Sequence, residues 1–353
     1  MGYSPIAGGA SVLKDANHLD STGILQLGKQ EGCRRLSKTI IAALLVCMVM
    51  VDGCASKDVH PAAAGFQAPS RGPKVLAAWM PWFGDKKHMD VGYSSQDTNV
   101  MRRQIQDALN RGISGFVVDW YGDRRPYHDK SFALLQQVAS EMHFQVALMY
   151  DETENDNGQA TDEAFGAFDK AYRAYIGPSA RYRDAYLTYN GRPVVFIFPK
   201  RGRTDWNRIR AKVNTWSSPP LLIYKDDASP EFAGAFDGYY AWVHPGHKGW
   251  APDGSDWGEQ YLDNFYKNMT TKRADKIVVG AAWPGFDDSH ASWGLNRHMD
   301  ARCGETFEQT LGFYRRYYND SNSIPFLLIE TWNDYEEGTA VERATYTNCN
   351  RPS

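Results

Sequence analysis

The sequence has few of the features that mark nucleotide-binding or zinc proteins. It contains five cysteines in 353 residues and no Cys-x-x-Cys pair, so a structural zinc site has no support. No Gly-x-Gly-x-x-Gly, Walker or His-Glu-x-x-His motif occurs, which removes support for nucleotide and zinc-hydrolase sites. We therefore expect neither a cofactor nor a metal.

An excess of charge of one sign is also missing. The 39 Lys and Arg side chains nearly balance 42 Asp and Glu, giving a net charge of −3. This balance excludes a broad basic surface for nucleic acid and an acidic solvating tail. The hydrophobic share of 42% and charged share of 23% are typical of a folded globular chain.

Long apolar runs are absent, and the longest, residues 39–51, follows Arg34, Arg35 and Lys38. A bilayer-spanning helix needs about 20 apolar residues, whereas a basic flank before a short apolar run is typical of a signal peptide. Gly53-Cys54 then resembles a bacterial lipobox, in which Cys54 would carry lipid. The alternative is a cytoplasmic protein with an apolar tail.

These segments predict the organisation of the N-terminal part. Residues 1–33 are expected to be a disordered leader, 34–54 a signal-peptide-like segment and 55–73 a linker rich in Ala, Pro, Gly and Ser. The protein is then expected to be exported to the periplasm or cell surface, touching membrane only through this anchor. Cys303 and Cys349 could pair in an oxidising compartment or remain free thiols.

From residue 74 onward, short apolar runs alternate with helix-like stretches. Eight runs are expected as strands: 74–80, 113–119, 144–150, 193–198, 220–224, 237–242, 277–282 and 325–330. Six stretches are expected as helices: 97–111, 130–142, 162–176, 204–214, 256–271 and 305–318, with Asp97, Asp162, Thr204 and Asp256 as N-caps. Eight such units predict a single (β/α)₈ TIM barrel over residues 74–347. The competing open doubly wound sheet usually carries a Gly-rich turn after its first strand, which is lacking here.

Catalytic residues of such barrels lie at the carboxyl ends of the strands. There the sequence places carboxylates among aromatic residues, which is the composition that glycoside hydrolysis needs. The alternatives are caps for Asp119 and Asp151, a loop role for His244, and a Trp- and Tyr-rich core. The candidates for substrate binding at these ends are Trp82, Asp119, Trp120, Tyr121, Asp151, Glu152, Trp242, His244, Trp283, Asp287, Trp332 and Asn333.

The last expected strand carries the most specific motif. Residues 330–342 read Glu-Thr-Trp-Asn-Asp-Tyr-Glu-Glu-Gly-Thr-Ala-Val-Glu. They resemble the Asn-Glu-Trp-His-Glu-Gly-Thr motif, followed shortly by a Glu, of glycoside hydrolase family 99, the endo-acting α-mannosidases and mannanases. The segment is similarly close to family 71, the α-1,3-glucanases. The residues that match family 99 are Asn333, Glu337, Gly338, Thr339 and Glu342.

Other strands extend the resemblance to family 99 over about residues 74–345. Residues 78–84, 112–122, 191–194 and 236–240 resemble its first, second, fourth and sixth strand motifs. Residues 284–288, with Arg297 downstream as a further binding candidate, resemble the loop after its seventh strand.

The resemblance implies hydrolysis of an α-linked, internal glycosidic bond. It places Glu337 as the general acid and Asp334 where family 99 deprotonates the sugar 2-hydroxyl. Asp is one methylene shorter than the Glu of that family, so we predict instead that Asp334 activates water and that the anomeric centre is inverted. Glu337 is then expected to have the higher pKa of the two. The alternative is that both residues only cap a turn.

Two other functions remain open at this point. One is a non-catalytic sugar-binding lipoprotein on the same barrel. The other is a barrel enzyme of another class, either an aldolase using Lys200 or Lys225 or a metal-dependent hydrolase near His244 and His247.

Overall fold

Eight parallel strands close into a barrel, as the sequence predicts. The computed structural model describes residues 72–154, 158–244, 253–319 and 321–343. The barrel strands are β1 (Lys74–Trp79), β2 (Gly115–Trp120), β3 (Gln145–Asp151), β5 (Arg192–Phe198), β6 (Leu221–Lys225), β7 (Gly238–Tyr240), β8 (Ile277–Ala282) and β11 (Phe326–Ile329). Each lies within two residues of an expected run, and the apolar character of the runs follows from burial on both faces.

Pairing of the first strand with the last closes the barrel. Strand β1 pairs in parallel with β2 and with β11, with Lys74 opposite Phe326 and Ala77 opposite Ile329. The remaining strands pair in chain order, and β3 joins β5 directly. The short β4 (Thr188–Tyr189) adds an antiparallel strand to β5 outside the barrel. The open-sheet alternative is therefore wrong.

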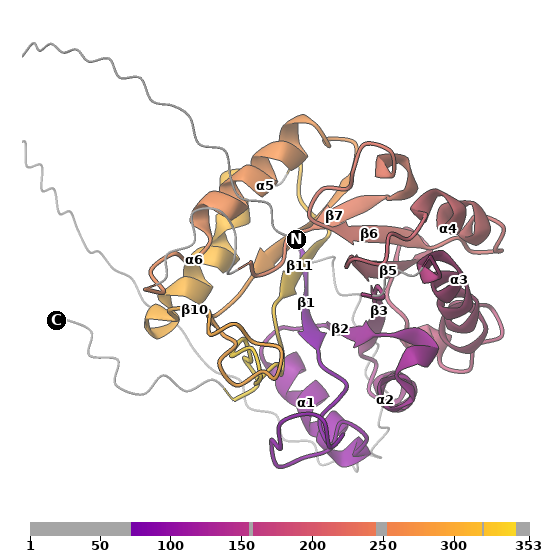
Figure 1. The fold of residues 1–353 in the computed structure, drawn as a ribbon, viewed down its shortest axis with the longest axis horizontal. Coiled ribbons are helices and arrows are strands. Elements are labelled where there is room, and N and C mark those ends of the chain that lie inside the picture. The colour runs from indigo at the N-terminus through magenta and orange to yellow at the C-terminus, as the bar shows by residue number, and fades with distance from the viewer. Residues whose placement is uncertain (1–71, 155–157, 245–252, 320, 344–353) are drawn as a thin grey trace, which may run out of the picture. The chain divides into compact units, whose positions relative to one another are not determined.

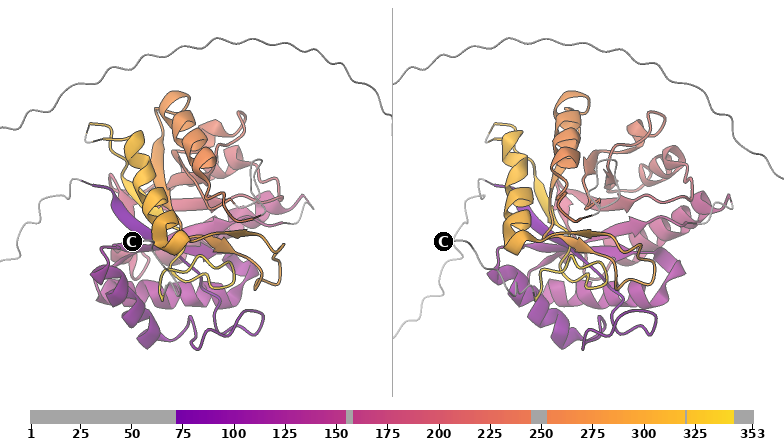
Figure 2. Two further views of the ribbon diagram at one scale, coloured as in Figure 1. Left: turned by 90° about the vertical axis from the view of Figure 1, so that its left-hand side faces the viewer. Right: turned by 60° about the vertical axis from the view of Figure 1, so that its left-hand side comes forward.

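Helices cover the outside of the barrel (Figures 1 and 2). They are α1 (Thr98–Asn110), α2 (Pro126–Glu141), α3 (Ala160–Ala171), α4 (Trp206–Val213), α5 (Glu259–Thr271) and α6 (Glu305–Phe313). Asp97 is the N-cap of α1, as predicted, and accepts from the Asn99 amide. One short 3₁₀ helix, Ala233–Ala235, replaces a full helix between β6 and β7.

Three other predicted caps are wrong. Helix α4 begins at Trp206 and is capped by Asp205, whose side chain accepts from the Arg208 amide, while the Thr204 amide donates to Glu152. Asp162 lies inside the first turn of α3, whose N-cap is Gln159. Asp256 precedes the true N-cap of α5, Gly258, whose left-handed φ of 86° suits glycine.

Alternation along the strands decides which side chains face the barrel interior. On β2 the ring of Phe116 packs on Phe144 and on Trp332, and Trp120 bonds to Asp129 of α2, so both face the helices. Successive side chains of a strand point to opposite faces, which leaves Val117 and Asp119 facing the interior. This alternation decides which residues at the strand ends can contribute side chains to the site described below.

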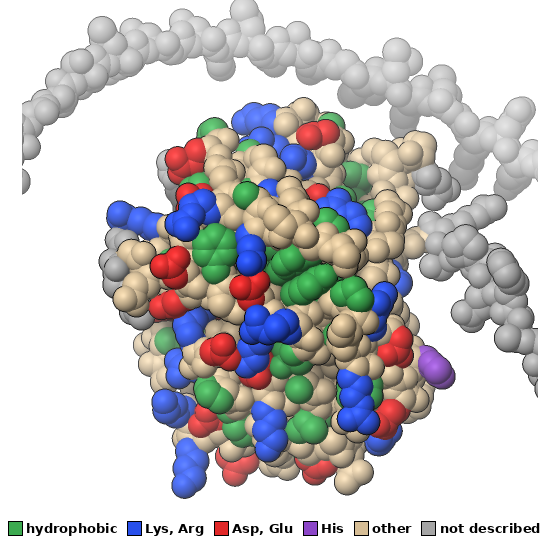
Figure 3. Space-filling model, turned by 90° about the vertical axis from the view of Figure 1, so that its right-hand side faces the viewer, with side chains coloured by type: hydrophobic (Ala, Val, Ile, Leu, Met, Phe, Trp, Pro, Cys, Tyr) green, Lys and Arg blue, Asp and Glu red, His purple; other side chains and the backbone are tan. Residues whose placement is uncertain are grey.

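The outer surface carries both signs of charge interspersed, as seen on the face formed by the helices in Figure 3. Among the described residues, no helix is both long enough and apolar enough to cross a bilayer. The predicted leader, signal segment, Cys54 and most of the linker lie outside the described residues, as does Cys349, while Cys303 is disulfide-bonded.

Candidate active site

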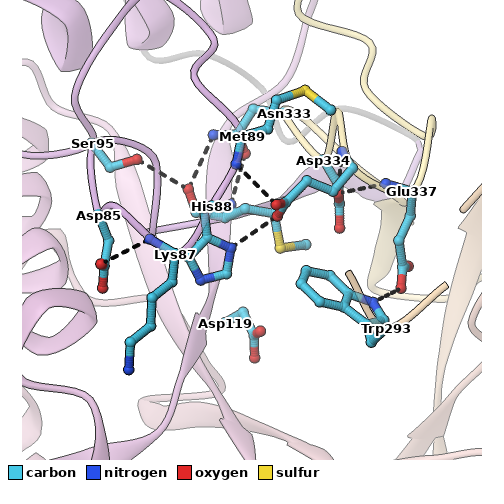
Figure 4. Close-up of polar contacts among 12 residues, drawn as sticks. Asp85, Lys87, His88, Met89, Ser95, Asp119, Trp293, Asn333, Asp334 and Glu337 are labelled. Atoms are coloured by element: carbon cyan, nitrogen blue, oxygen red, sulfur yellow. Dashed lines mark hydrogen bonds and ion pairs between the residues drawn. The ribbon is translucent and has the colours of Figure 1, made fainter. Parts of the chain in front are cut away.

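Asp334 and Glu337 lie in one turn at the carboxyl end of β11. Asp334 Oδ1 accepts from the amides of Glu336 (3.1 Å) and Glu337 (3.0 Å), and the Asp334 amide donates to Thr331 Oγ1 at 2.7 Å. Asp334 therefore does cap the turn, as the simpler interpretation of this spacing requires. The same bonds fix the Asp334 carboxyl group and the backbone of Glu337 at the mouth of the barrel, meaning the carboxyl ends of the strands and the loops that follow them (Figure 4).

A loop after β8 lies against this turn, and the two run side by side in Figure 2. Strands β9 (Phe286–Asp287) and β10 (His298–Met299) form a small hairpin, and its loop, residues 288–297, reaches the carboxyl pair. The Asp287 amide donates to the Glu337 carbonyl at 2.8 Å. Trp293 Nε1 donates to Glu337 Oε1 at 3.0 Å.

A second pair of carboxylates lies across the mouth on β2 and β3. Asp119 accepts from the Tyr121 hydroxyl at 2.9 Å, and Asp151 forms an ion pair with Lys200 Nζ at 3.1 Å. Both carboxyl groups are buried, and each has one oxygen, Oδ1, without a hydrogen-bond partner among the described residues. Buried polar atoms are rarely left unpaired, so these oxygens are available to a ligand's hydroxyl groups.

Burial raises the pKa of all four carboxyl groups of these two pairs. It raises the pKa of both Asp334 and Glu337, and for Asp334 the neighbouring Glu337 charge adds to the effect. Burial, followed by the charge of Asp151, raises the pKa of Asp119 well above its ordinary value. The pKa of Asp151 rises to about 6, again mainly through burial, with Lys200 opposing the shift. Protons are thus held at this site at pH values where exposed carboxyl groups have lost theirs.

The loop after β1 supplies aromatic rings beside the carboxyl pair. Trp82 stacks on His88 with a centroid distance of 5.0 Å and an interplanar angle of 17°. His88 Nδ1 and the Met89 amide both contact the carboxylate of Glu336, at 2.9 and 3.0 Å. Glu336 therefore holds this loop against the β11 turn, and its neighbour Glu337 remains available to the mouth (Figure 4).

Asn333 and Glu342, which match the family 99 motif, have structural roles. Asn333 accepts from the Met80 amide at 2.7 Å and donates to the Met80 carbonyl at 3.1 Å, tying the end of β1 to the turn after β11. Glu342 accepts from Tyr93, Tyr335 and Gln104. Neither side chain contacts the carboxyl pair through these bonds.

Three predicted tryptophans lie outside the mouth. Trp120 Nε1 donates to Asp129 in the helix layer, Trp283 Nε1 donates to the Trp257 carbonyl, and the guanidinium of Arg111 covers the ring of Trp332. All three are fully buried. For Trp120 the physical reason is alternation, because it is next in sequence to the inward-facing Asp119. Trp283 and Trp332 lie beyond the ends of β8 and β11, and the contacts just named hold them in the core. The core interpretation holds for them, and their prediction as binding residues is corrected.

The other predicted residues either hold loops of the mouth in place or lie away from Asp334 and Glu337. Glu152 accepts from the amides of Lys200 and Thr204 and shapes that loop. Arg297 is paired with Asp288 at 2.7 Å. Trp242 contacts Phe198 at the β5 and β7 ends. His244 borders a cavity of about 730 Å³ beside α5, whose lining includes neither Asp334 nor Glu337. The predicted residues that gather at the mouth are Trp82, Asp119, Tyr121, Asp151, Asp334 and Glu337.

Three residues of the mouth were missed as binding candidates. Trp293 lies 44 positions from its partner Glu337, and only its place between the residue 284–288 motif and Arg297 hinted at it. His88 lies in a polar loop with no periodic pattern. Lys200 was considered only as an aldolase lysine, whereas it forms the ion pair of Asp151.

No group of three or more potential metal-ligating side chains occurs within the described ranges. The carboxylates at the mouth are instead engaged with amides, hydroxyls, an ammonium group and an indole. The chemistry that this arrangement offers is general acid–base catalysis, in which one carboxyl group gives a proton to a bound molecule and its neighbour accepts one.

Replacing Asp119 with Asn should stabilise the protein at alkaline pH. A carboxyl group with a raised folded-state pKa binds its proton more tightly when folded, so stability is lost as pH rises from the ordinary value of 3.8 through the folded value. Asn keeps an acceptor for Tyr121 but carries no charge. We expect the Tm of Asp119→Asn to exceed that of the wild type by about 2–4 °C at pH 8, corresponding to about 1 kcal/mol.

At pH 5 this advantage should shrink, because a carboxyl group with a raised pKa carries less charge at the lower pH. Asp275→Asn, at an exposed position, is the matched control and should leave Tm unchanged at both pH values. Scanning calorimetry provides the measurement. If Asp119→Asn lowered Tm equally at both pH values, the prediction that the buried Asp119 charge destabilises the fold at alkaline pH would be wrong.

Comparison with known proteins supports the fold assignment. No family model and no curated protein matches the chain. Two structures of the GH99 endo-α-mannosidase from Bacteroides thetaiotaomicron are similar. The one in complex with bis-tris propane has a TM-score of 0.59 at 18% identity, over 79% of this chain and 90% of the other. The second has a TM-score of 0.57 at 16% identity, over 78% and 89%.

A structure described as a glycoside hydrolase-like protein gives a TM-score of 0.55 at 15% identity, covering 78% of this chain and 88% of its own. The (β/α)₈ barrel of this chain is thus similar in fold to the GH99 endo-α-mannosidase structures, in agreement with the resemblance noted in the sequence.

Proposed function

We propose that the barrel is a glycoside hydrolase that cleaves an α-linked polysaccharide or oligosaccharide, with Glu337 as the acid and Asp334 as the base. The observation that carries this proposal is the pair of carboxyl groups held in one turn at the barrel mouth, with Asp334 buried and Glu337 half-buried. Aromatic rings of Trp82 and Trp293 lie beside the pair. Two carboxyl groups flanking a space with flat apolar walls are what glycosidic cleavage requires.

In the proposed step, Glu337 donates its proton to the glycosidic oxygen as the bond to the anomeric carbon breaks. A water attacks that carbon from the opposite face and gives its proton to Asp334. The leaving sugar departs as an alcohol, and the configuration is inverted. Burial raises the pKa of Glu337, which suits a proton donor near neutral pH. Burial and the charge of Glu337 raise the pKa of Asp334 well above its ordinary value, so the expected order of the two pKa values gains no support and stays a prediction.

The α-linkage and an internal cleavage position rest on the resemblance of the strand motifs to family 99 and family 71. The solved family 99 structure carries the description endo-α-mannosidase, which fits this assignment. Both features belong to the proposal.

A panel of α-1,3-glucan, α-mannan and dextran provides the test. We expect one of the three to be cleaved to oligosaccharides, with the β-anomer formed first from the α-linked substrate because the mechanism inverts. Product size by chromatography and anomer by proton NMR are the readouts. If none is cleaved while one still binds, the non-catalytic sugar-binding alternative is favoured instead.

An aldolase is the second enzymatic alternative. An attacking lysine must be neutral, and the charges of Asp151 and Asp119 raise the pKa of Lys200 despite its burial. Lys225 fits better, since burial lowers its pKa, although its ammonium group lies over the Phe198 ring at 4.2 Å. Covalent trapping by borohydride with a carbonyl substrate would favour the aldolase, and loss of activity with a chelator would favour a metal-dependent hydrolase.

A further inference from the structure

The 288–297 loop exposes large apolar side chains beside the carboxyl pair. Trp293 is 43% exposed and Leu295 is 71% exposed. In the part of the chain that the structure describes, Leu109 is the remaining large hydrophobic residue with comparable exposure. Apolar surface gathered at one loop of a soluble protein usually marks a contact with a ligand or partner.

The loop is held in a defined conformation. Asp288 is fully buried and accepts from the amides of Leu295 (3.1 Å) and Arg297 (2.7 Å), as well as from the Arg297 guanidinium. At Gly294 a Cβ atom would lie 1.8 Å from the Asp288 carbonyl oxygen, so the backbone can approach this closely only at glycine. The indole of Trp293 is therefore presented by a fixed support.

The surroundings of the indole point to a sugar beside the acid. Its Nε1 donates to Glu337 at 3.0 Å, while the rings of Trp82 and His88 meet it edge-on at 6.4 and 5.9 Å. In Figure 4 the indole lies between the carboxyl groups of Asp119 and Glu337. A flat apolar surface that is partly exposed next to the proton donor is placed for the sugar that receives the proton.

We propose that Trp293 forms the subsite for the leaving-group sugar and is the positioning residue of Glu337. The inference rests on the proposed function. The proton of Glu337 goes to the glycosidic oxygen, so the departing pyranose must lie against this side of the mouth. Its apolar C–H face can stack on the exposed indole, in the way that aromatic side chains bind flat apolar surfaces.

The indole N–H has a second effect during proton transfer. As Glu337 gives up its proton, it becomes a carboxylate, and a fixed N–H donor stabilises the charge that develops. The bond also favours the ionised form before the reaction, so it opposes the rise in pKa that burial causes. Trp293 thus tunes the pH at which Glu337 still holds its proton.

The variants Trp293→Phe and Trp293→Ala separate the two roles. Phe keeps an aromatic face but has no donor, so kcat on the cleaved α-glycan should fall about tenfold. The alkaline limb of the pH profile should move up by about half a unit to one unit. Ala removes the face as well and should also raise KM several-fold. Trp216→Phe is the control, since Trp216 stacks on Tyr172 at 4.4 Å, after α4, and its kinetics should match wild type.

An aryl α-glycoside with an acidic phenol as leaving group sharpens the test, because such a group departs without a proton. Trp293→Phe should leave kcat on this substrate unchanged. Equal losses on both substrates would indicate a merely structural role and overturn the inference, as would kinetics identical to wild type on the glycan.

Failure of the proposed function can be told apart from failure of this inference. Titration of the Glu337 carboxyl by carbon NMR in the wild type and in Trp293→Phe needs no substrate. A higher pKa in the variant supports the positioning role even if hydrolysis is not found, and an unchanged pKa overturns it even if Glu337 proves essential.

Discussion

Glu337→Gln is expected to lose hydrolysis of the α-linked glycan by about 10²–10⁴-fold while still binding it. Gln is nearly the same size and can still accept from the Trp293 indole, but it has no proton to give. General acid catalysis typically contributes a factor of this size. The measurement is kcat on the glycan together with Kd by calorimetry, and Tm should remain within a few degrees of the wild type.

The neighbouring residue provides the matched control. Glu336→Gln keeps an acceptor for His88 Nδ1 and for the Met89 amide, so the loop after β1 should stay in place. We expect its kcat to remain within about threefold of wild type, since it is not a proton donor to the substrate. If Glu336→Gln lost activity and Glu337→Gln did not, the assignment of the acid would be wrong.

Asp334→Asn is expected to be comparably inactive, for a different reason. The amide oxygen of Asn can still accept from the Glu336 and Glu337 amides, which donate to Asp334 at 3.1 and 3.0 Å, so the turn should persist. The side chain can no longer take a proton from water, and we expect a loss of about 10²–10⁴-fold. Glu337 also loses a neighbouring carboxyl group, so its pKa should fall.

The variant Asp334→Glu tests the stereochemical prediction. Glu restores the residue of family 99 and moves the carboxyl group one methylene closer to the sugar. If the wild type gives the β-anomer first and Asp334→Glu gives the α-anomer, the length of this side chain decides between water activation and attack through the sugar 2-hydroxyl. An α-anomer from the wild type would refute inversion, and Asp334 would then act as in family 99.

The positions of the strands could be predicted because their cause is local. Each barrel strand is an apolar segment buried on both faces, such as Val278, Val279 and Ala281 in β8, and such segments are visible one by one in the sequence. Helix starts were less predictable. Before α4 the sequence offers two adjacent capping residues, Thr204 and Asp205, and the side chain of Asp205 is the one that accepts from the Arg208 amide.

The site could be predicted only in part. Asp334 and Glu337 are close in sequence and share a motif, so their proximity is local information. Asp119 and Trp120 are neighbours at a strand end and looked equivalent in the sequence. Their side chains point to opposite faces of the strand, because the side-chain period is two. An error of one residue in the predicted strand end is enough to exchange the inward and the outward side chain. Trp293 depends on how the loop supported by Asp288 folds back, which no local pattern encodes.

The two bonds between Asn333 and Met80 span 253 positions of the chain. Contacts at this separation form late in folding, because a very long segment must first be organised. Asp334 and Glu337 follow Asn333 closely in the sequence. A partly folded barrel in which only β1 to β8 are assembled would therefore lack the proposed carboxyl pair. The Met80 amide would exchange slowly with solvent deuterium only in molecules whose ring of strands has closed. Protection of this amide therefore reports closure of the barrel, independently of any substrate.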